Sequence, residues 1–168
     1  MSAANELSRA LIAGGGPLAY MRFRPAWAYI DGIREFGRFF CKTTFEEPAV
    51  AERVRIVLQE ALENAVKYST RGPESELELS ISSDGKSLEI SVCSMPDPAH
   101  AQSLKRELEE LYSREPEQAY LSAFERASED PDASARLGLA RIRFEGNVDL
   151  SLTEEEGGRI RVTASGAL

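Results

Sequence analysis

The stretch Val54-Arg-Ile-Val-Leu-Gln-Glu-Ala-Leu-Glu-Asn-Ala-Val-Lys-Tyr-Ser69 decides the predicted fold, because it is the strongest helix candidate in the chain. At about 100° per residue, the apolar side chains in and just before it gather on one broad face. The members of that face are Val50, Val54, Val57, Leu58, Ala61, Leu62 and Ala65. Because Glu52, Gln59 and Glu63 lie on the opposite side, we expect an amphipathic helix with one face in the core.

A polar row runs along the rim of that apolar face. Glu60, Asn64 and Lys67 follow each other at spacings of four and three residues, so they project from the same side of the helix. A carboxylate, an amide and an ammonium in one row could activate a hydroxyl, ligate a metal and neutralise a phosphate. The same spacing also arises by chance on amphipathic helices, so the row alone predicts no more than a half-buried rim.

The overall composition limits the class of protein. The 168 residues fit one domain spanning residues 1–168, and a net charge of −8 argues against nucleic acid or an anionic membrane as the main partner. Cys41 and Cys93 lie far apart in apolar runs, which predicts reduced thiols in the core. With no signal peptide and no apolar run of about 18 residues, we expect a cytoplasmic protein.

The residues before the central helix supply a strand and a second helix. Residues 1–16 are expected to form a flexible or helical N-terminal extension, with any helix ending at Ala13. The glycines at 14–16 are interpreted as a linker, because a phosphate loop would need a following Lys and Ser or Thr. Leu18–Arg24 alternates as a strand does. From Pro25 onward a stripe of apolar residues, mostly aromatic, predicts a helix packed into the core; it comprises Trp27, Ile30, Ile33, Phe36, Phe39 and Phe40.

Two hairpins follow the central helix. Segments 76–82 and 87–93 alternate in hydrophobicity around Asp84-Gly85, a strong turn signal, and their buried face should comprise Leu77, Leu79, Ile81, Leu88, Ile90 and Val92. Near the C-terminus, segments 148–153 and 159–163 form the second hairpin around residues 154–158.

Between the hairpins the chain is helical and acidic. Two helices are expected within 99–127, a polar loop over 128–134, and a short helix over Arg136–Phe144 entered through a glycine turn. His100 has no partner at metal-ligand spacing and is interpreted as a surface residue. The element order predicts an α+β fold, a two-layer α/β sandwich with a mixed or antiparallel sheet covered by helices.

Two stretches together resemble the histidine-kinase-like (GHKL) ATPase superfamily. Glu60-Ala-Leu-Glu-Asn-Ala-Val-Lys-Tyr-Ser69 is similar to its N-box helix. Arg136-Leu-Gly-Leu-Ala-Arg-Ile142 is similar to its later Gly-x-Gly-Leu box, with Arg136 in place of the first glycine. The resemblance covers most of residues 17–164, and the length is similar to that of stand-alone regulators such as anti-sigma-factor kinases and cyanobacterial-type or biofilm-switch regulators.

The resemblance implies a role for each matching residue. Glu60 would be the catalytic base, and Asn64 would ligate a magnesium ion held between the phosphates of ATP. Lys67 would neutralise phosphate charge, and Gly138 would let the backbone approach the triphosphate beside a helix N-terminus. Arg136 would supply further phosphate charge or close the pocket.

The sequence departs from the superfamily at the adenine site. Where an Asp-x-Gly-x-Gly box is expected, the chain has Cys93-Ser-Met-Pro-Asp-Pro98, without a glycine and with prolines on both sides of Asp97. The acidic helices within 99–127 replace the glycine-rich lid. The magnesium and phosphate half of the site is therefore retained and the adenine half is not.

Three hypotheses for function follow. The first is a signalling regulator that acts by protein contact in a partner-switching pathway, with degenerate binding of ATP and magnesium. The alternative is an active ATP-dependent serine/threonine protein kinase. For both, the expected partner is an anti-sigma-antagonist-like (STAS-type) or other regulatory protein. The third is a dimerisation module, which would pair two copies of the chain as a homodimer.

Overall fold

The computed structural model describes residues 16–70, 75–130 and 134–168, with five strands and five helices in this part of the chain. The strands are β1 (Ala19–Phe23), β2 (Leu77–Ser83), β3 (Ser87–Ser94), β4 (Asp149–Glu154) and β5 (Ile160–Ala167). The helices are α2 (Trp27–Phe45), α3 (Pro48–Tyr68), α4 (Pro98–Tyr112), α5 (Pro116–Glu129) and α6 (Ser134–Phe144). The expected helix over residues 1–13 and the glycines at 14 and 15 lie outside the described residues.

The strands form one sheet in the order β1-β2-β3-β5-β4, and every neighbouring pair is antiparallel. Of the two predicted forms, the antiparallel sheet is therefore the one that occurs. Both hairpins are confirmed, β2–β3 and β4–β5. Leu79, Val92, Val162 and Leu152 lie side by side across four strands. Because side chains alternate along a strand, this register places the predicted hairpin residues on one apolar face.

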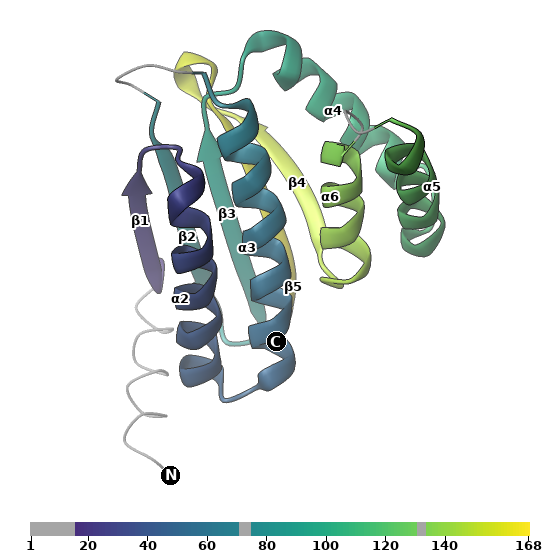
Figure 1. Cartoon of the computed structure of the whole chain (residues 1–168). Coiled ribbons are helices and arrows are strands. Elements are labelled where there is room, and N and C mark those ends of the chain that lie inside the picture. Colours follow the sequence, from purple (N-terminus) through teal and green to yellow (C-terminus); the bar gives the residue numbers. More distant parts are fainter. Residues whose placement is uncertain (1–15, 71–74, 131–133) are drawn as a thin grey trace.

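Helices α2 and α3 lie side by side over that apolar face, with α6 next to α3 (Figure 1). Pro48 occupies the first turn of α3, where its missing N–H costs no helical hydrogen bond. The predicted core face of α3 is also confirmed, since all of its members are buried except Ala61, which lines a small pocket. These observations establish an α+β fold in which α3 lies at the centre of the helical layer.

The turn between β2 and β3 is fixed by Asp84. Its Oδ1 atom accepts hydrogen bonds from the backbone N–H groups of Lys86 and Ser87 at 2.8 and 2.7 Å. These bonds favour the ionised carboxylate and lower the pKa of Asp84 to about 2. Gly85 adopts a positive φ of 83°, a conformation that glycine reaches without strain. The Asp-Gly signal in the sequence therefore predicts this turn correctly.

The prediction that the aromatic stripe of α2 lies in the core is wrong for three of its members. Trp27 is 59% exposed, Phe36 40% and Phe39 66%. The buried residues of α2 are instead Ile30, Gly37 and Cys41. The close approach of α3 explains this choice, because a Cβ atom at Gly37 would lie 2.1 Å from Leu58 Cδ1. Small residues allow the contact, and the large rings turn outward.

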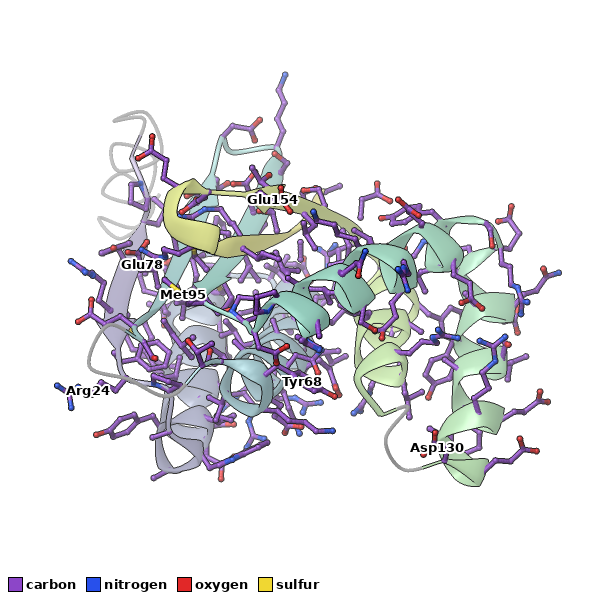
Figure 2. All side chains as sticks on the ribbon, turned by 90° about the horizontal axis from the view of Figure 1, so that it is seen from above. Arg24, Tyr68, Glu78, Met95, Asp130 and Glu154 are labelled. Atoms are coloured by element: carbon purple, nitrogen blue, oxygen red, sulfur yellow. The ribbon has the colours of Figure 1, made fainter. Side chains whose placement is uncertain are left out.

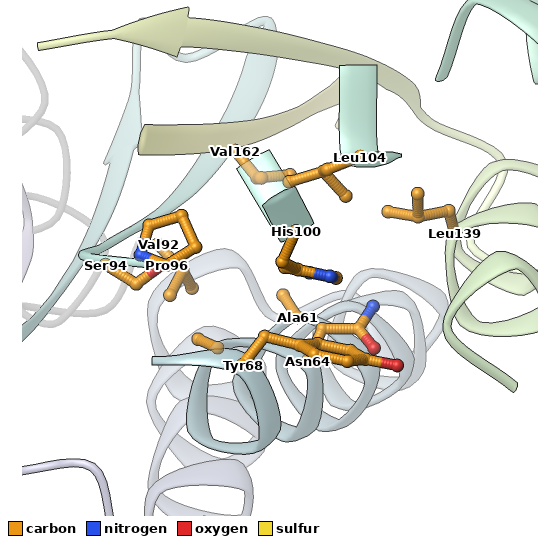
Figure 3. Close-up of a pocket in the computed structure, with 11 residues that line it drawn as sticks. Ala61, Asn64, Tyr68, Val92, Ser94, Pro96, His100, Leu104, Leu139 and Val162 are labelled. Atoms are coloured by element: carbon orange, nitrogen blue, oxygen red, sulfur yellow. The ribbon is translucent and has the colours of Figure 1, made fainter. Parts of the chain in front are cut away.

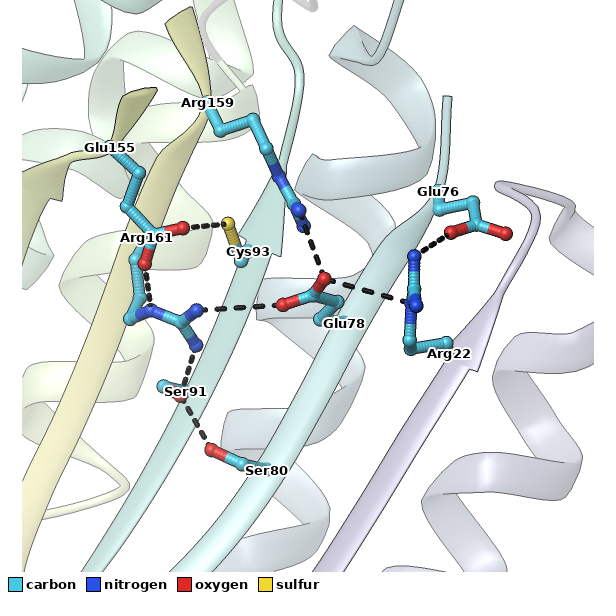
Figure 4. A network of polar contacts seen from close by, with 9 residues as sticks. All are labelled: Arg22, Glu76, Glu78, Ser80, Ser91, Cys93, Glu155, Arg159 and Arg161. Atoms are coloured by element: carbon cyan, nitrogen blue, oxygen red, sulfur yellow. Dashed lines mark hydrogen bonds and ion pairs between the residues drawn. The ribbon is translucent and has the colours of Figure 1, made fainter. Parts of the chain in front are cut away.

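The other face of the sheet is polar. Glu78 contacts Arg159 at 2.9 Å, Arg161 at 3.6 Å and Arg22 at 3.7 Å (Figure 4). Arg161 also donates to Ser91 Oγ at 3.1 Å, which lies 2.7 Å from Ser80 Oγ. Cys93 lies beside this network, and burial raises the pKa of its thiol to about 11. Both cysteines are free and buried, as predicted.

Candidate functional site

The polar row of α3 faces α6, and the two helices approach each other at Gly138. A Cβ atom on Gly138 would lie 2.8 Å from Glu60 Oε2 and 3.4 Å from Asn64 Nδ2. Gly138 is buried inside α6, four residues after the helix begins at Ser134. The expected glycine turn before this helix is therefore wrong, and the N-terminus of α6 lies a full turn away from Gly138. The structure nevertheless brings Glu60, Asn64 and Gly138 together.

Glu60 is held by an arginine that sequence reasoning did not select. Arg141 Nη1 donates to Glu60 Oε1 at 2.9 Å, and Arg141 Nε donates to Glu145 Oε2 at 3.0 Å. Burial raises the pKa of Glu60, and the charge of Arg141 opposes that rise. The Glu60 side chain is only 15% exposed, so Arg141 compensates a carboxylate that is largely removed from water. One of the two oxygens of the predicted base is thereby occupied.

Asn64 faces a small pocket between α3, the sheet and α4. The cavity has a volume of about 30 Å³, and its lining also includes Ala61, Ser94, Leu139 and Val162. The Nδ2 atom of Asn64 is buried without a hydrogen-bond partner among the described residues. The lining is otherwise mostly apolar, so this amide nitrogen is an unpaired polar group at the edge of an apolar cavity, which is costly to leave unpaired.

Two stacked rings cover the Asn64 pocket. The rings of Tyr68 on α3 and His100 on α4 lie 3.5 Å apart between centroids, with 12° between their planes (Figure 3). Burial holds the pKa of His100 below its ordinary value, Asp97 opposes that change, and Lys67 reinforces it. His100 is therefore half-buried over the pocket, and its predicted position on the open surface is wrong.

The position of His100 is set by the start of α4. Asp97 caps this helix, and its Oδ1 atom accepts from the backbone N–H of His100 at 2.9 Å. Asp97 is the acid nearest to the position where the superfamily resemblance would imply an adenine box, and in this structure it is engaged in capping. Helix α4 therefore begins with His100 held against Tyr68.

The remaining predicted residues lie away from the pocket. Lys67 is exposed near the end of α3, with its Nζ atom 5.0 Å from the centroid of the Tyr68 ring. Arg136 Nη1 lies 3.1 Å from Glu110 Oε2 on α4. Of the five predicted site residues, Glu60, Asn64 and Gly138 lie together. Lys67 lies beside the Tyr68 ring, and Arg136 contacts Glu110 on α4.

The signal for Arg141 was present in the sequence, whereas the signal for His100 was not. Arg141 follows Gly138 by three residues, which on a helix places both on the side that faces α3. His100 and Tyr68 meet only because the first turn of α4 lies beside the end of α3, which no local pattern specifies. Tyr68 itself lies within residues 60–69, one of the two stretches that carry the superfamily resemblance.

The residues present do not fit ATP and magnesium in this conformation. A cavity of about 30 Å³ has room for one or two water molecules, and ligand pockets are commonly about 300–1,000 Å³. A nucleotide could enter only if α4 moved away from Tyr68.

Within the described residues, no helix combines the length and the apolar character needed to cross a membrane.

No protein-family model matches the chain, and no curated protein matches its sequence. Among solved structures, the chain is similar to one from "The crystal structure of SiaB-SiaC complex from Pseudomonas aeruginosa". The match covers 97% of each chain with a TM-score of 0.64 and 19% sequence identity. At this identity, the likeness establishes a shared fold.

Proposed function

We propose that the chain is a signalling regulator that acts by contact with a protein partner in a partner-switching pathway, and that its nucleotide site is degenerate. The observation that carries the proposal is the closed Asn64 pocket, with a volume of about 30 Å³ beneath the His100–Tyr68 stack. A protein that turned over ATP at this place would need an open cavity there.

Two further observations support action by contact. The structural neighbour comes from a complex of two proteins. Large apolar side chains are also left exposed on two separate helices, Trp27 and Phe39 on α2 and Leu121 and Phe124 on α5. Exposed apolar patches of this kind are typical of protein interaction surfaces. We propose a STAS-type regulatory protein as the partner.

Binding without nucleotide tests the proposal. We expect the purified chain to bind a STAS-type partner in the absence of ATP, measured by biolayer interferometry. The Glu60→Gln and Asn64→Ala variants should bind equally well, because neither side chain reaches the surface that makes the contact. Strict dependence of binding on ATP, lost in Asn64→Ala, would contradict the proposal.

A second candidate is the serine/threonine kinase, and one observation favours it. Glu60 and Asn64 converge beneath Gly138, and the Asn64 amide has a buried nitrogen without a partner among the described residues. Transfer of label from radioactive ATP to a STAS-type partner, lost in Glu60→Gln, is the result that this candidate requires. Absence of label transfer from ATP to a partner that binds would reject it.

A further inference from the structure

Helix α5 packs with its small residues inward and its large apolar residues outward. Ala119 and Ala123 are buried against the neighbouring helices, whereas Leu121 is 53% exposed and Phe124 55% exposed. The helix forms the outer boundary of the molecule beyond α4 and α6, with Asp130 just past its end (Figure 2). Since removing such area from water is favourable, α5 presents a face suited to a partner.

The apolar face continues onto α6. Phe144 is 39% exposed, and its ring stacks on that of Tyr120 with centroids 5.3 Å apart. Tyr120 and Phe124 are one helical turn apart on α5, and Leu121 lies on the adjacent row. We call this surface the α5 ridge, comprising Tyr120, Leu121, Phe124 and Phe144.

Acidic residues border the α5 ridge without cations to neutralise them. Glu117 and Glu125 lie one turn before and one turn after Leu121, and no ion pair engages either of them in the part of the chain that the structure describes. The one basic residue of α5, Arg126, turns inward to Glu110 at 2.8 Å. The ridge therefore offers apolar side chains within a negative field.

Nearby arginines are likewise held by the protein itself. Arg143 Nη1 donates to the carbonyl oxygens of Leu111 and Arg114 at 2.6 and 2.9 Å, and its guanidinium lies 4.2 Å from the Tyr112 ring centroid. Arg141 is engaged by Glu60 and Glu145. One exposed cation, Arg114, also reaches α5, where its Nη1 atom donates to Ser122 Oγ at 2.8 Å. Because α5 itself carries Glu117, Glu125 and Glu129 against one arginine, its own charge is negative.

We propose that the α5 ridge docks a basic amphipathic helix of a partner protein. Side chains at spacings of three and four residues along a straight helix form ridges and grooves that accept another helix. Apolar anchors of the partner would cover Leu121 and Phe124, and flanking Lys or Arg would face Glu117 and Glu125. A second copy of this chain would place acid against acid, so it fits the ridge poorly. The inference rests on the proposed function, since it specifies the chemistry of the partner.

Two synthetic peptides test the inference on the full chain. Both are labelled helical 18-residue peptides with leucines on one face, and the flanks are all Lys in one and all Glu in the other. Fluorescence anisotropy should show binding of the Lys peptide alone. Phe124→Ser should weaken that binding about tenfold, equivalent to about 1.4 kcal/mol. The double variant Glu117→Lys with Glu125→Lys should reverse the preference to the Glu peptide.

The matched control is Phe39→Ser on α2, which removes a ring that is 66% exposed, against 55% for Phe124, and should leave Lys-peptide binding unchanged. Thermal melts establish that each variant is folded. Unchanged binding by the charge-reversed variant, or loss of binding in Phe39→Ser, would overturn the inference. Self-association that light scattering detects in the wild type and that Phe124→Ser abolishes would also overturn it, because a second copy would then occupy the ridge.

A separate measurement distinguishes failure of this inference from failure of the proposed function. A STAS-type partner that still binds the charge-reversed variant with full affinity would contradict the α5 ridge and leave regulation by contact standing. Loss of that binding in the charge-reversed variant, with wild-type affinity in Phe39→Ser, would support both.

Discussion

Helices α2 and α3 lie side by side over the sheet, yet they bury different kinds of side chain. α3 buries its large aliphatic residues and encloses Glu60 and Asn64 of its polar row, while Lys67 stays exposed. α2 buries Gly37 and Cys41 and leaves Trp27 and Phe39 in solvent. The difference teaches that the closest helix contact selects small residues, and that hydrophobicity alone does not decide which face turns inward.

The largest expected difference between the two helices is in their response to truncation. Leu58→Ala should lower the free energy of unfolding by about 2–5 kcal/mol, because Leu58 is fully buried and a cavity would remain. Phe39→Ser should change it by less than about 0.5 kcal/mol, since Phe39 is 66% exposed. Urea denaturation of both variants measures the contrast, and comparable losses would place Phe39 in the core after all.

Two glycines of α2 test the close contact directly. Gly37→Ala should cost about 1–3 kcal/mol through overpacking against Leu58. Gly32 is the matched control in the same helix, since a Cβ atom there would meet nothing within 4 Å. Gly32→Ala should therefore stabilise the protein by about 1 kcal/mol through helix propensity. Equal effects of the two substitutions on the melting temperature would disprove close packing at Gly37.

The contribution of the Glu60–Arg141 ion pair to stability can be tested by substituting Arg141. Arg141→Ala should cost about 1–2 kcal/mol, because Glu60 would lose a charge-assisted hydrogen bond while Arg141 itself is partly exposed. Adding Glu60→Gln should recover part of the loss, since the buried charge is then absent. Chemical denaturation of the single and double variants measures this coupling, and strictly additive losses would mean that the pair contributes nothing.

The smallest expected effect is the pH dependence of the cover over Asn64. The folded state holds the pKa of His100 below its ordinary value of 6.5. As the pH falls, the unfolded chain therefore binds a proton at a higher pH than the folded chain does. Stability is therefore complete above pH 6.5 and declines as the pH falls toward the lowered pKa. His100→Phe retains the ring without titrating and should remove this part of the decline. Identical pH profiles of stability for the two proteins would show that the stack carries no such linkage.

The sequence predicts the framework of the fold well. Both hairpins and the core face of α3 could be predicted because period-two and period-3.6 patterns are local. Whether the sheet is mixed or antiparallel could not be decided from those patterns. The inward face of α2 could not, because Gly37 is selected by Leu58 on another helix.

Only the part of the candidate site that depends on local spacing along a helix could be predicted. Glu60 and Asn64 share one helix, and their meeting with Gly138 confirms that the two quoted stretches lie together. The contacts of Arg136 with Glu110 and of His100 with Tyr68 depend on where α4 packs against its neighbours. Tertiary contacts set that position, and no local sequence pattern specifies it. The catalytic and ligand-binding roles of these residues remain predictions.

Calorimetry with ATP and magnesium tests the central claim most directly. If the Asn64 pocket stays closed beneath His100, the full chain should show no saturable heat at ATP concentrations up to about 1 mM, which corresponds to binding weaker than about −4 kcal/mol. Binding with a micromolar Kd that Asn64→Ala abolishes would contradict the account, because it would show that α4 opens readily and that the polar row of α3 holds a nucleotide.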